Sequence, residues 1–543
     1  MEFLDKLTSE ALDFDYILSN IKILTPYGKT YKDQLRPYLP GEEKALIEEL
    51  DKIDSILPLI EDNEFKSNVK GILIHIKDLR TSVRRTMEGS VLNEVELFEL
   101  KNFLFFLRDL EKLMKKYKLD QFEDIEIKRI EKLEKLLDPE DTKIWTFYIY
   151  DAYSDELKKI RGQKKDTEKQ IKIEKKALKE KIKEELKLNI RPDGTLVISK
   201  EDTESLKTIE NYPYLSYVSE TYMNVKFAIK PTNEISELDR RLIHLKEREE
   251  NEEFKIRERL SGEIANSRKA LFRNMASIGK LDLILGKAQY AIDINGVRPE
   301  ISQAHHINIE SGRHPKVEEN LRKRGLKFTP ITIDIEKGVT CITGANMGGK
   351  TISLKLVGLL ATMAQYGLYV PANKMILGLN NFISTSIGDM QSTDQGLSTF
   401  GGEIKLVQEA IEKADSRGLI LIDELARGTN PEEGYAISKA VVNNLKNKNS
   451  ITLITTHYDN IANSDGVVHL QVVGLSKIDF DVLDDELKDV ETDKMDIINR
   501  YMDYRLKVVE RASEVPKDAI NIARLMGLEE DIILDAEKIL EEK

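Results

Sequence analysis

Apolar positions divide the chain into a helical first part and a later part in which strands and helices alternate. Over residues 1–150, apolar side chains recur at three- and four-residue spacing with few glycines or prolines between them, which is typical of amphipathic helices. Such stripes contain Leu46, Ile47, Leu50, Ile53, Ile56 and Leu57, and Phe103, Leu104, Phe106, Leu107, Leu110 and Leu113. From about residue 307 to residue 473, short apolar runs alternate with helical spacing. The pattern predicts a helical scaffold and, further along, an α/β domain.

Two long charged segments separate these parts. Residues 155–190 hold 13 Lys or Arg against 8 Asp or Glu, and a second charged segment runs from about residue 234 to residue 275. Neither has enough apolar positions for a helix buried on all sides, so we expect the two to pair as an antiparallel coiled-coil arm. Basic charge on the first helix favours either a solvated face or contact with DNA, and charge alone does not decide between them.

A small insert, residues 191–231, is expected at the tip of the arm. It opens with a turn sequence, Arg191-Pro192-Asp193-Gly194, and short strands are predicted near residues 217–218 and 225–229. After the second charged segment an apolar helical pattern returns, and we expect residues 266–306 to rejoin the scaffold.

The composition narrows the class of protein. A chain of 543 residues is too long for one core, so two to four domains are expected. Its single cysteine, Cys341, excludes a disulfide within one chain, no apolar run is long enough to cross a membrane, and the N-terminus lacks a signal-peptide pattern. These features favour a cytoplasmic protein with no membrane partner. The net charge of −13 lowers the expectation of nucleic-acid binding without excluding it.

One stretch carries the strongest chemical signal. Residues 344–351 match the Walker A or P-loop pattern G-x-x-x-x-G-K-[ST], after a short apolar strand and before a helical pattern. This context favours a nucleoside-triphosphate site over a glycine-rich turn of structural purpose, because backbone N–H groups at a helix N-terminus bind phosphate. The expected backbone ligands are Gly344, Ala345, Asn346, Met347, Gly348 and Gly349. Lys350 is expected to reach the β/γ-phosphates, and the Thr351 hydroxyl to bind Mg²⁺.

Two further strands end in residues suited to ATP hydrolysis. The apolar run 419–422 is followed by Asp423 and Glu424, of which Asp423 can hold Mg²⁺ and Glu424 can orient and deprotonate the attacking water. The run 451–454 leads to His457, which can contact a γ-phosphate or its water, or can be an ordinary structural histidine. A lone acidic pair is weak evidence, but following a phosphate loop it indicates an ATPase.

The start of another predicted helix has two interpretations. Ser398 and Thr399 precede an apolar helical pattern, with Glu403 a few residues on. Hydroxyls at a helix N-terminus suit a phosphate, but they are also common capping residues. Spacing alone favours a cap.

Taken together, these motifs resemble the MutS family of ABC-type ATPases. The likeness rests on T-G-A-N-M-G-G-K-T at 343–351, S-T-F at 398–400, D-E-L-A-R-G-T-N-P-E-E-G at 423–434 and T-T-H at 455–457, with Arg313-His314-Pro315 upstream. It is most specific over about 310–475. Weaker likeness elsewhere, as at Ile387-Gly388-Asp389 and at the base of the arm, resembles the branch without the mismatch-reading domain.

The resemblance implies a multidomain fold. Residues 1–150 and 266–306 would form an all-α lever domain, residues 151–265 the coiled-coil clamp arm, and residues 307–543 an α/β P-loop ATPase domain with C-terminal helices. The protein would be a homodimer.

The resemblance also assigns roles in two ATP sites shared between protomers. Lys350, Thr351, Asp423 and Glu424 would act from one subunit, and Ser398 and Thr399 of the other would close on the γ-phosphate. His457 would sense that phosphate, and Phe328 would stack near adenine. The implied cofactors are ATP and Mg²⁺.

The sequence departs from the family pattern in several places. No mismatch-reading domain with its Phe-x-Glu wedge precedes the lever-like helices, and no nuclease module follows the ATPase, so a stand-alone MutS-like protein is expected. Ala345 replaces a frequent proline and Ala426 a frequent glycine. Neither change removes a side chain that acts as a ligand, so hydrolysis is expected, whereas mismatch specificity is not.

Two functions follow. The first is a dimeric, DNA-associated clamp driven by ATP hydrolysis and related to mismatch repair or recombination. The second is an ATPase that remodels a protein partner, as some stand-alone relatives are associated with reactivating adenosylcobalamin-dependent amino-acid mutases. The acidic balance favours the second, as does a tip in which residues 191–230 carry 5 basic against 6 acidic side chains, since a phosphate-gripping tip should be basic.

Overall fold

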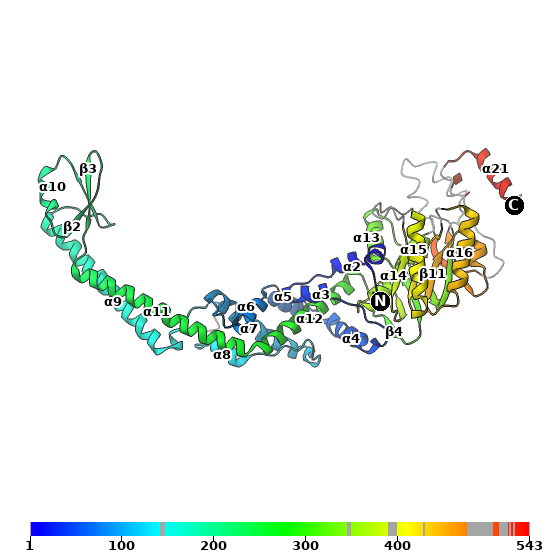
Figure 1. Ribbon diagram of the computed structural model, residues 1–543, viewed down its shortest axis with the longest axis horizontal. Helices are drawn as coiled ribbons and strands as arrows, with labels where there is room; N and C mark the ends of the chain where they lie inside the picture. The colour runs from blue at the N-terminus through cyan, green and yellow to red at the C-terminus, as the bar shows by residue number, and fades with distance from the viewer. Residues whose placement is uncertain are drawn as a thin grey trace. The chain divides into compact units, whose positions relative to one another are not determined.

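The computed structural model divides into two compact units. It describes residues 2–141, 147–344, 349–388, 399–426, 429–474, 503–509, 520, 523–524 and 527–541. Unit 1 comprises residues 1–75, 121–125 and 277–543, and unit 2 comprises residues 76–120 and 126–276 (Figure 1). The four-segment scheme of lever, arm, return and ATPase remains a prediction. None of the described helices is long and apolar enough to span a bilayer.

Unit 1 begins with short helices: α1 (Lys6–Ala11), α2 (Phe14–Asn20), α3 (Pro26–Asp33), α4 (Glu43–Glu61) and α5 (Asn63–Leu73). Local sequence sets their starts. Before α3, the Thr25 hydroxyl accepts a hydrogen bond from the N–H of Gly28, and Pro26 occupies the first turn, where no donor is needed. Asp282 on α12 (Arg268–Asp293) in turn accepts from the backbone N–H and the hydroxyl of Thr25, both at 2.7 Å.

A six-stranded sheet forms the centre of unit 1. Its order is β13 (Asp503–Val508), β12 (Val467–Gly474), β7 (Gly338–Thr343), β11 (Ile451–Thr455), β10 (Leu419–Asp423) and β9 (Ile383–Ser386). All neighbours pair in parallel except β12 and β13. Every residue of β7 and β11 is buried, as expected for parallel strands covered on both faces.

A second sheet and a set of helices complete unit 1. The sheet has the order β4 (Glu300–Ser302), β8 (Lys374–Gly378), β5 (His306–Gly312) and β6 (Ile331–Glu336). The helices are α13 (Pro315–Lys323), α14 (Lys350–Gln365), α15 (Thr399–Lys413), α16 (Pro431–Leu445), α17 (Asp459–Ala462) and α21 (Glu530–Glu541), with a 3₁₀ turn, η4 (Ala414–Ser416). Val407 and Ala410 of α15 and Val442 and Leu445 of α16 share one apolar cluster with β7, β10 and β11.

Buried polar contacts hold the C-terminal end of α14. The Lys287 ammonium, 1 % exposed, lies 2.8 Å from a carboxylate oxygen of Glu49 on α4 and donates to the carbonyl of Tyr366 at 3.1 Å. The Gln365 side-chain amide donates to the carbonyls of Tyr38 and Asn380, each at 2.9 Å. Because these contacts are buried, α14 is fixed relative to α4 and α12 within unit 1.

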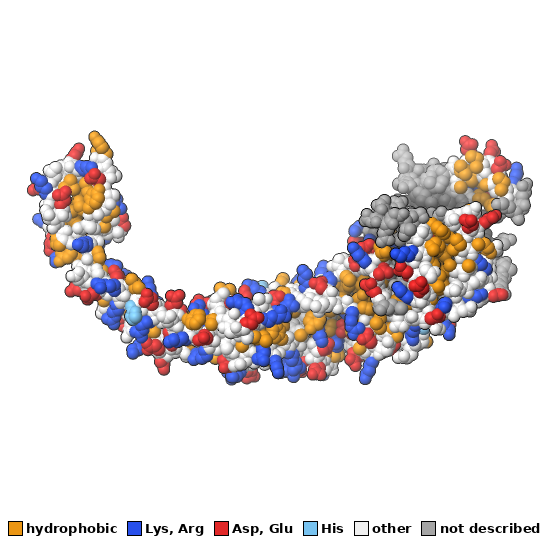
Figure 2. All heavy atoms as spheres, in the orientation of Figure 1, with side chains coloured by type: hydrophobic (Ala, Val, Ile, Leu, Met, Phe, Trp, Pro, Cys, Tyr) orange, Lys and Arg blue, Asp and Glu red, His pale blue; other side chains and the backbone are white. Residues whose placement is uncertain are grey.

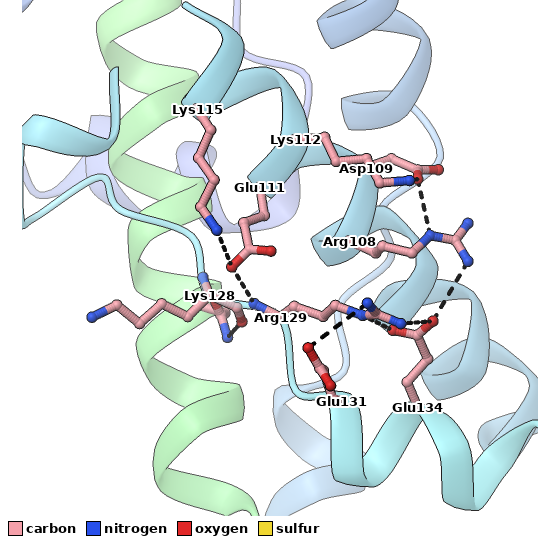
Figure 3. Close-up of polar contacts among 10 residues, drawn as sticks. Arg108, Asp109, Glu111, Lys112, Lys115, Lys128, Arg129, Glu131 and Glu134 are labelled. Carbon is pink, nitrogen blue, oxygen red and sulfur yellow. Dashed lines mark hydrogen bonds and ion pairs between the residues drawn. The ribbon is translucent and has the colours of Figure 1, made fainter. Parts of the chain in front are cut away.

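Unit 2 contains a helical part and two long helices. The helical part consists of α6 (Arg80–Met87), α7 (Glu94–Lys116) and α8 (Glu131–Leu137), with 3₁₀ turns η1 (Leu119–Gln121) at its boundary and η2 (Asp151–Tyr153). Glu134 on α8 lies between two guanidinium groups (Figure 3). Its carboxylate is 3.5 Å from Arg108 on α7 and accepts two bonds from Arg129, at 2.6 and 3.0 Å. This contact joins α7 to α8.

The long helices α9 (Asp155–Leu186) and α11 (Asn233–Asn266) run antiparallel. Ion pairs across them show the direction: Arg161 contacts Glu249 and Glu253 near one end, and Lys175 contacts Asp239 near the other. The first charged segment is helical as far as Leu186, four residues short of the predicted end at residue 190. The second segment divides at Ser267, where α11 ends and α12 begins.

A small α/β tip connects α9 to α11. It has an antiparallel sheet of order β1 (Thr195–Ser199), β3 (Asn224–Ile229) and β2 (Leu215–Glu220), with α10 (Thr203–Glu210) beside it. Strands β2 and β3 agree with the prediction, whereas β1 and α10 were not predicted. Leu196, Phe227 and Ile209 pack with Leu178 and Ile182 of α9 in one apolar cluster.

Candidate functional site

Three parallel strands end at one edge of the six-stranded sheet. In the pairing register, Asp423 of β10 lies opposite Thr455 of β11, and Thr455 lies opposite Ile342 of β7. Parallel strands place their C-terminal ends at the same edge. The phosphate loop, the acidic pair and the residues before His457 are therefore neighbours, although up to about a hundred residues separate them along the chain.

Two glycines delimit the phosphate loop. Gly344 has a φ of +130° and Gly349 a φ of +79°, values that residues with a Cβ rarely adopt. Space is also short at both positions, since an added Cβ would lie 3.1 Å from Val472 at Gly344 and 2.8 Å from the Tyr504 ring at Gly349. Helix α14 begins at the next residue, Lys350. The predicted ligands Ala345, Asn346, Met347 and Gly348 lie outside the described residues.

The Lys350 ammonium is directed into the loop. The residue is only 3 % exposed, and its Nζ donates to the carbonyl of Gly344 at 2.7 Å and lies 3.0 Å from a carboxylate oxygen of Glu424. A buried cation of this kind requires an anionic partner. The structure thus brings the predicted phosphate-binding lysine and the predicted base together.

Thr351 and Asp423 form an oxygen-rich pair beside it. The Thr351 hydroxyl donates to one oxygen of Asp423 at 2.8 Å, and the Thr455 hydroxyl donates to the other at 2.6 Å. A hydroxyl and a carboxylate at the N-terminus of a helix match the hard oxygen ligands that Mg²⁺ prefers alongside phosphate and water. Thr455 was not singled out from the sequence.

A tight turn follows Asp423. Glu424 and Ala426 both adopt the left-handed region, with φ of +46° and +63°, which costs about 1 kcal/mol per residue with a Cβ. The N–H of Glu424 donates to the Thr455 hydroxyl at 2.9 Å, the carbonyl of Leu425 accepts from Ser438 at 3.1 Å, and the N–H of Ala426 donates to Glu403 at 3.0 Å. Three side chains therefore fix the turn that carries Glu424.

Four further residues were predicted for the site. His457 is exposed, with its ring centroid 3.9 Å from that of Tyr458. Phe328 is half-buried in the segment before β6, and β6 lies beside β13. Ser398 lies outside the described residues; Thr399 is the first residue of α15, and its side chain is not described.

Comparison with known proteins agrees with this geometry. Residues 340–542 match the family model of MutS domain V. The chain is similar to proteins named endonuclease MutS2: 28 % identical to that of Halothermothrix orenii and 29 % to that of Caldanaerobacter subterraneus subsp. tengcongensis, each over 99 % of this chain. It is 32 % identical to that of Acetivibrio thermocellus over 71 % of this chain.

The chain belongs to the MutS family. The matches to the MutS2 proteins extend through the helical parts as well as the sheet, so the relationship is not confined to the phosphate loop. This MutS-family chain covers 65 %, 65 % and 49 % of the length of these three relatives, which is less than two thirds of each.

Besides Thr455, two further contacts at the site were not predicted from the sequence. The Tyr504 ring on β13 lies against Gly349 at the start of α14, and burial raises the pKa of its phenol. No motif surrounds Tyr504, and about 150 residues separate it from the loop, so only the tertiary structure reveals it. Glu403 was considered as part of a helix cap, yet its carboxylate contacts Ala426 in another element.

Proposed function

We propose that this chain binds and hydrolyses ATP with the help of Mg²⁺. The observation that carries the proposal is the convergence of Lys350, Thr351, Asp423 and Glu424 at one sheet edge, with Lys350 against Glu424 at 3.0 Å and Thr351 against Asp423 at 2.8 Å. This is the residue set that phosphoryl transfer to water requires.

Each side chain has a distinct task in this proposal. Lys350 releases Glu424 and pairs with the β/γ-phosphates, while the N-terminus of α14 binds phosphate oxygens. Thr351 and Asp423 would hold Mg²⁺, which would neutralise charge on the phosphates. Glu424 then orients the attacking water and accepts its proton. In this proposal His457 contacts the γ-phosphate, and Phe328 stacks near the adenine base.

We further propose that the ATP site is shared between two protomers. Ser398 and Thr399 precede or begin α15, and in this proposal they close on the γ-phosphate of a partner chain. Support comes from the MutS family relationship and from the match to MutS domain V. The shared site is tested by mixing Lys350→Ala protomers with Ser398→Ala/Thr399→Ala protomers. One of the two composite sites in such a heterodimer contains only unchanged residues. No recovery of ATP hydrolysis at any mixing ratio contradicts the shared site.

The proposed client of the ATPase is DNA. The relatives named endonuclease MutS2 support it, and in this proposal α9 and α11 form the clamp arm, with the helices of residues 1–150 and 266–306 as the lever. Lys165, Lys169 and Lys172 are exposed on α9 and available to phosphates. Lys164, on the same helix, pairs with Glu249 of α11.

Specific observations favour a protein client as the second candidate. Basic and acidic side chains are interspersed along α9 and α11 (Figure 2), and ion pairs to α11 use Arg161, Lys164 and Lys175. At the tip, Tyr222 is 97 % and Met223 63 % exposed, and exposed apolar residues of this kind often mark protein contacts. The protein then acts as an ATP-driven remodelling factor, such as one that reactivates an adenosylcobalamin-dependent mutase.

A salt-titrated DNA-binding experiment separates the two clients. If the arm grips DNA, charge reversal at Lys165, Lys169 and Lys172 weakens binding and reduces the slope of log K against log salt by about 0.9 for each phosphate that the arm no longer neutralises. Reversal at Lys6 and Lys66, two exposed lysines of unit 1, serves as the control. Wild-type affinity weaker than about 10⁻⁴ M at physiological salt with ATP present contradicts the DNA client.

A further inference from the structure

Glu403 has a contact that its sequence position does not predict. It lies in the second turn of α15, beyond the third helical position from which a glutamate commonly reaches back to its own helix cap. In the structure its Oε1 accepts a hydrogen bond from the N–H of Ala426 at 3.0 Å, 23 residues away along the chain and two residues after Glu424. The contact therefore connects α15 with the turn that carries Glu424.

The turn needs such an anchor. Glu424 and Ala426 both hold positive φ values, +46° and +63°, and a residue with a Cβ stays there only when its surroundings impose it. Thr455 fixes the first residue of the turn and Ser438 the second. Glu403 fixes the third, so without it Ala426 can relax toward an ordinary conformation and rotate Glu424 with it.

The surroundings of Glu403 strengthen the bond. The side chain is half-buried, and burial raises the pKa of its carboxyl, with Asp423 adding to the rise and the Ala426 hydrogen bond opposing it. Hydrogen bonds of this kind are stronger where water is excluded. The packing of α15 against β10 through the cluster that includes Val407 and Ile422 keeps the carboxyl in place.

We propose that Glu403 is a positioning residue for the proposed ATPase reaction: through Ala426 it sets the orientation in which Glu424 faces the phosphate loop. The inference rests on the proposed ATPase function. The role depends on the position of the Glu403 oxygen that accepts the hydrogen bond and not on the negative charge of the carboxylate. Glu403 takes no part in proton transfer.

Two substitutions separate reach from charge. Glu403→Gln keeps an oxygen at the same distance and loses the charge, whereas Glu403→Asp keeps the charge and shortens the side chain by one methylene. We expect Glu403→Gln to retain turnover within about twofold and Glu403→Asp to lose about tenfold in kcat, the effect of one buried hydrogen bond. ATP affinity should be unchanged in both, because Lys350, Thr351 and Asp423 are untouched.

The experiment measures kcat and, separately, the Kd for ATP in wild type, both Glu403 variants and Glu409→Gln. Glu409 is an exposed glutamate of the same helix and should behave as wild type. Thermal unfolding verifies folding, and if Glu403→Asp does not fold, Ser438→Ala removes the neighbouring anchor and is expected to lower kcat alike.

The possible outcomes are distinct. Wild-type kcat in a folded Glu403→Asp variant overturns the inference, and if that variant does not fold, wild-type kcat in Ser438→Ala does so. A parallel decrease of ATP affinity and kcat also overturns it, because it indicates a structural role. A Glu403→Gln variant as impaired as Glu424→Gln also overturns it, because the carboxylate then takes part in the chemistry. Absence of hydrolysis in the wild type contradicts the proposed function itself.

Discussion

The sheet edge of unit 1 and the paired helices of unit 2 hold charged residues in opposite ways. At the sheet edge, Lys350 and Asp423 are each held by partners on other strands and loops, and Lys350 is almost fully buried. On α9 and α11, charges lie mostly at the surface and pair across the two helices. The buried surroundings of the sheet edge have a low dielectric constant, which strengthens each electrostatic contact there. Water and salt weaken the contacts between α9 and α11.

This difference determines which parts of the molecule tolerate change. One substitution at the sheet edge leaves a buried group without its partner, so its effect should be large and local. A substitution on α9 or α11 leaves the former partner in contact with water, so little free energy of folding is lost. We therefore expect substitutions to have their largest effects in the phosphate loop and their smallest on the arm.

The largest effect is expected at Lys350. Replacing it by alanine removes the cation aimed into the loop, together with the positive charge that lies 3.0 Å from the Glu424 carboxylate. We expect ATP binding to become undetectable by calorimetry at concentrations that saturate the wild type. Lys337, exposed just before β7, is the matched control. ATP affinity equal to that of wild type in Lys350→Ala would falsify the assignment of the loop.

Glu424→Gln should separate binding from turnover. The amide cannot accept a proton from water, so turnover should fall by about 10²-fold or more, the scale of a missing general base. ATP and Mg²⁺ binding should persist, because Thr351 and Asp423 remain. Steady-state hydrolysis and equilibrium binding measure the two quantities, with Glu432→Gln on α16 as the control. Hydrolysis at the wild-type rate would place the base elsewhere.

His314 makes the stability of unit 1 depend on pH. The residue is fully buried beside Asp13, and burial lowers its pKa from 6.5 to about 4. A lowered folded-state pKa means that the unfolded chain binds the proton more readily. The contribution of neutral His314 to the free energy of unfolding is therefore fully present above pH 6.5. It decreases as the pH falls toward 4, by about 3 kcal/mol in all.

The measurement is denaturant unfolding of the wild type and His314→Gln between pH 7 and pH 4.5. The glutamine cannot take up a proton at this position, so the stability of the variant should depend less on pH, whatever its stability at pH 7. Equal slopes in the two proteins would show that His314 is not the titrating group.

The smallest effect is expected on the arm. Arg161 is half-buried and pairs with Asp151, Glu249 and Glu253. Its replacement by alanine should destabilise this end of α9 and α11 by about 1 kcal/mol, since ion pairs that water still reaches contribute little individually. Hydrogen exchange in α9 and α11 should report it, and the difference from wild type should shrink in about 1 M salt. An effect that salt leaves unchanged would indicate weaker packing instead of a missing charge.

The two regions also differ in how far the sequence predicts them. The sheet edge was predictable because phosphate binding demands particular residues at fixed spacing, as in Gly349-Lys350-Thr351. The contacts of Tyr504 and Glu403 were not, because they depend on which distant elements pack together. On the arm, charge spacing predicted two long helices, but the pairing of Lys164 with Glu249 required the register of α9 against α11.

Helix α14 gives the nucleotide site a mechanical connection. Its first residue is Lys350 in the phosphate loop, and its other end is gripped by Lys287 and Gln365. A helix of 16 residues is about 24 Å long and resists compression along its axis. Its two ends are therefore mechanically coupled: a displacement of Lys350 along the helix axis would also move the Tyr366 carbonyl that Lys287 holds, and with it the buried contacts to α4 and α12.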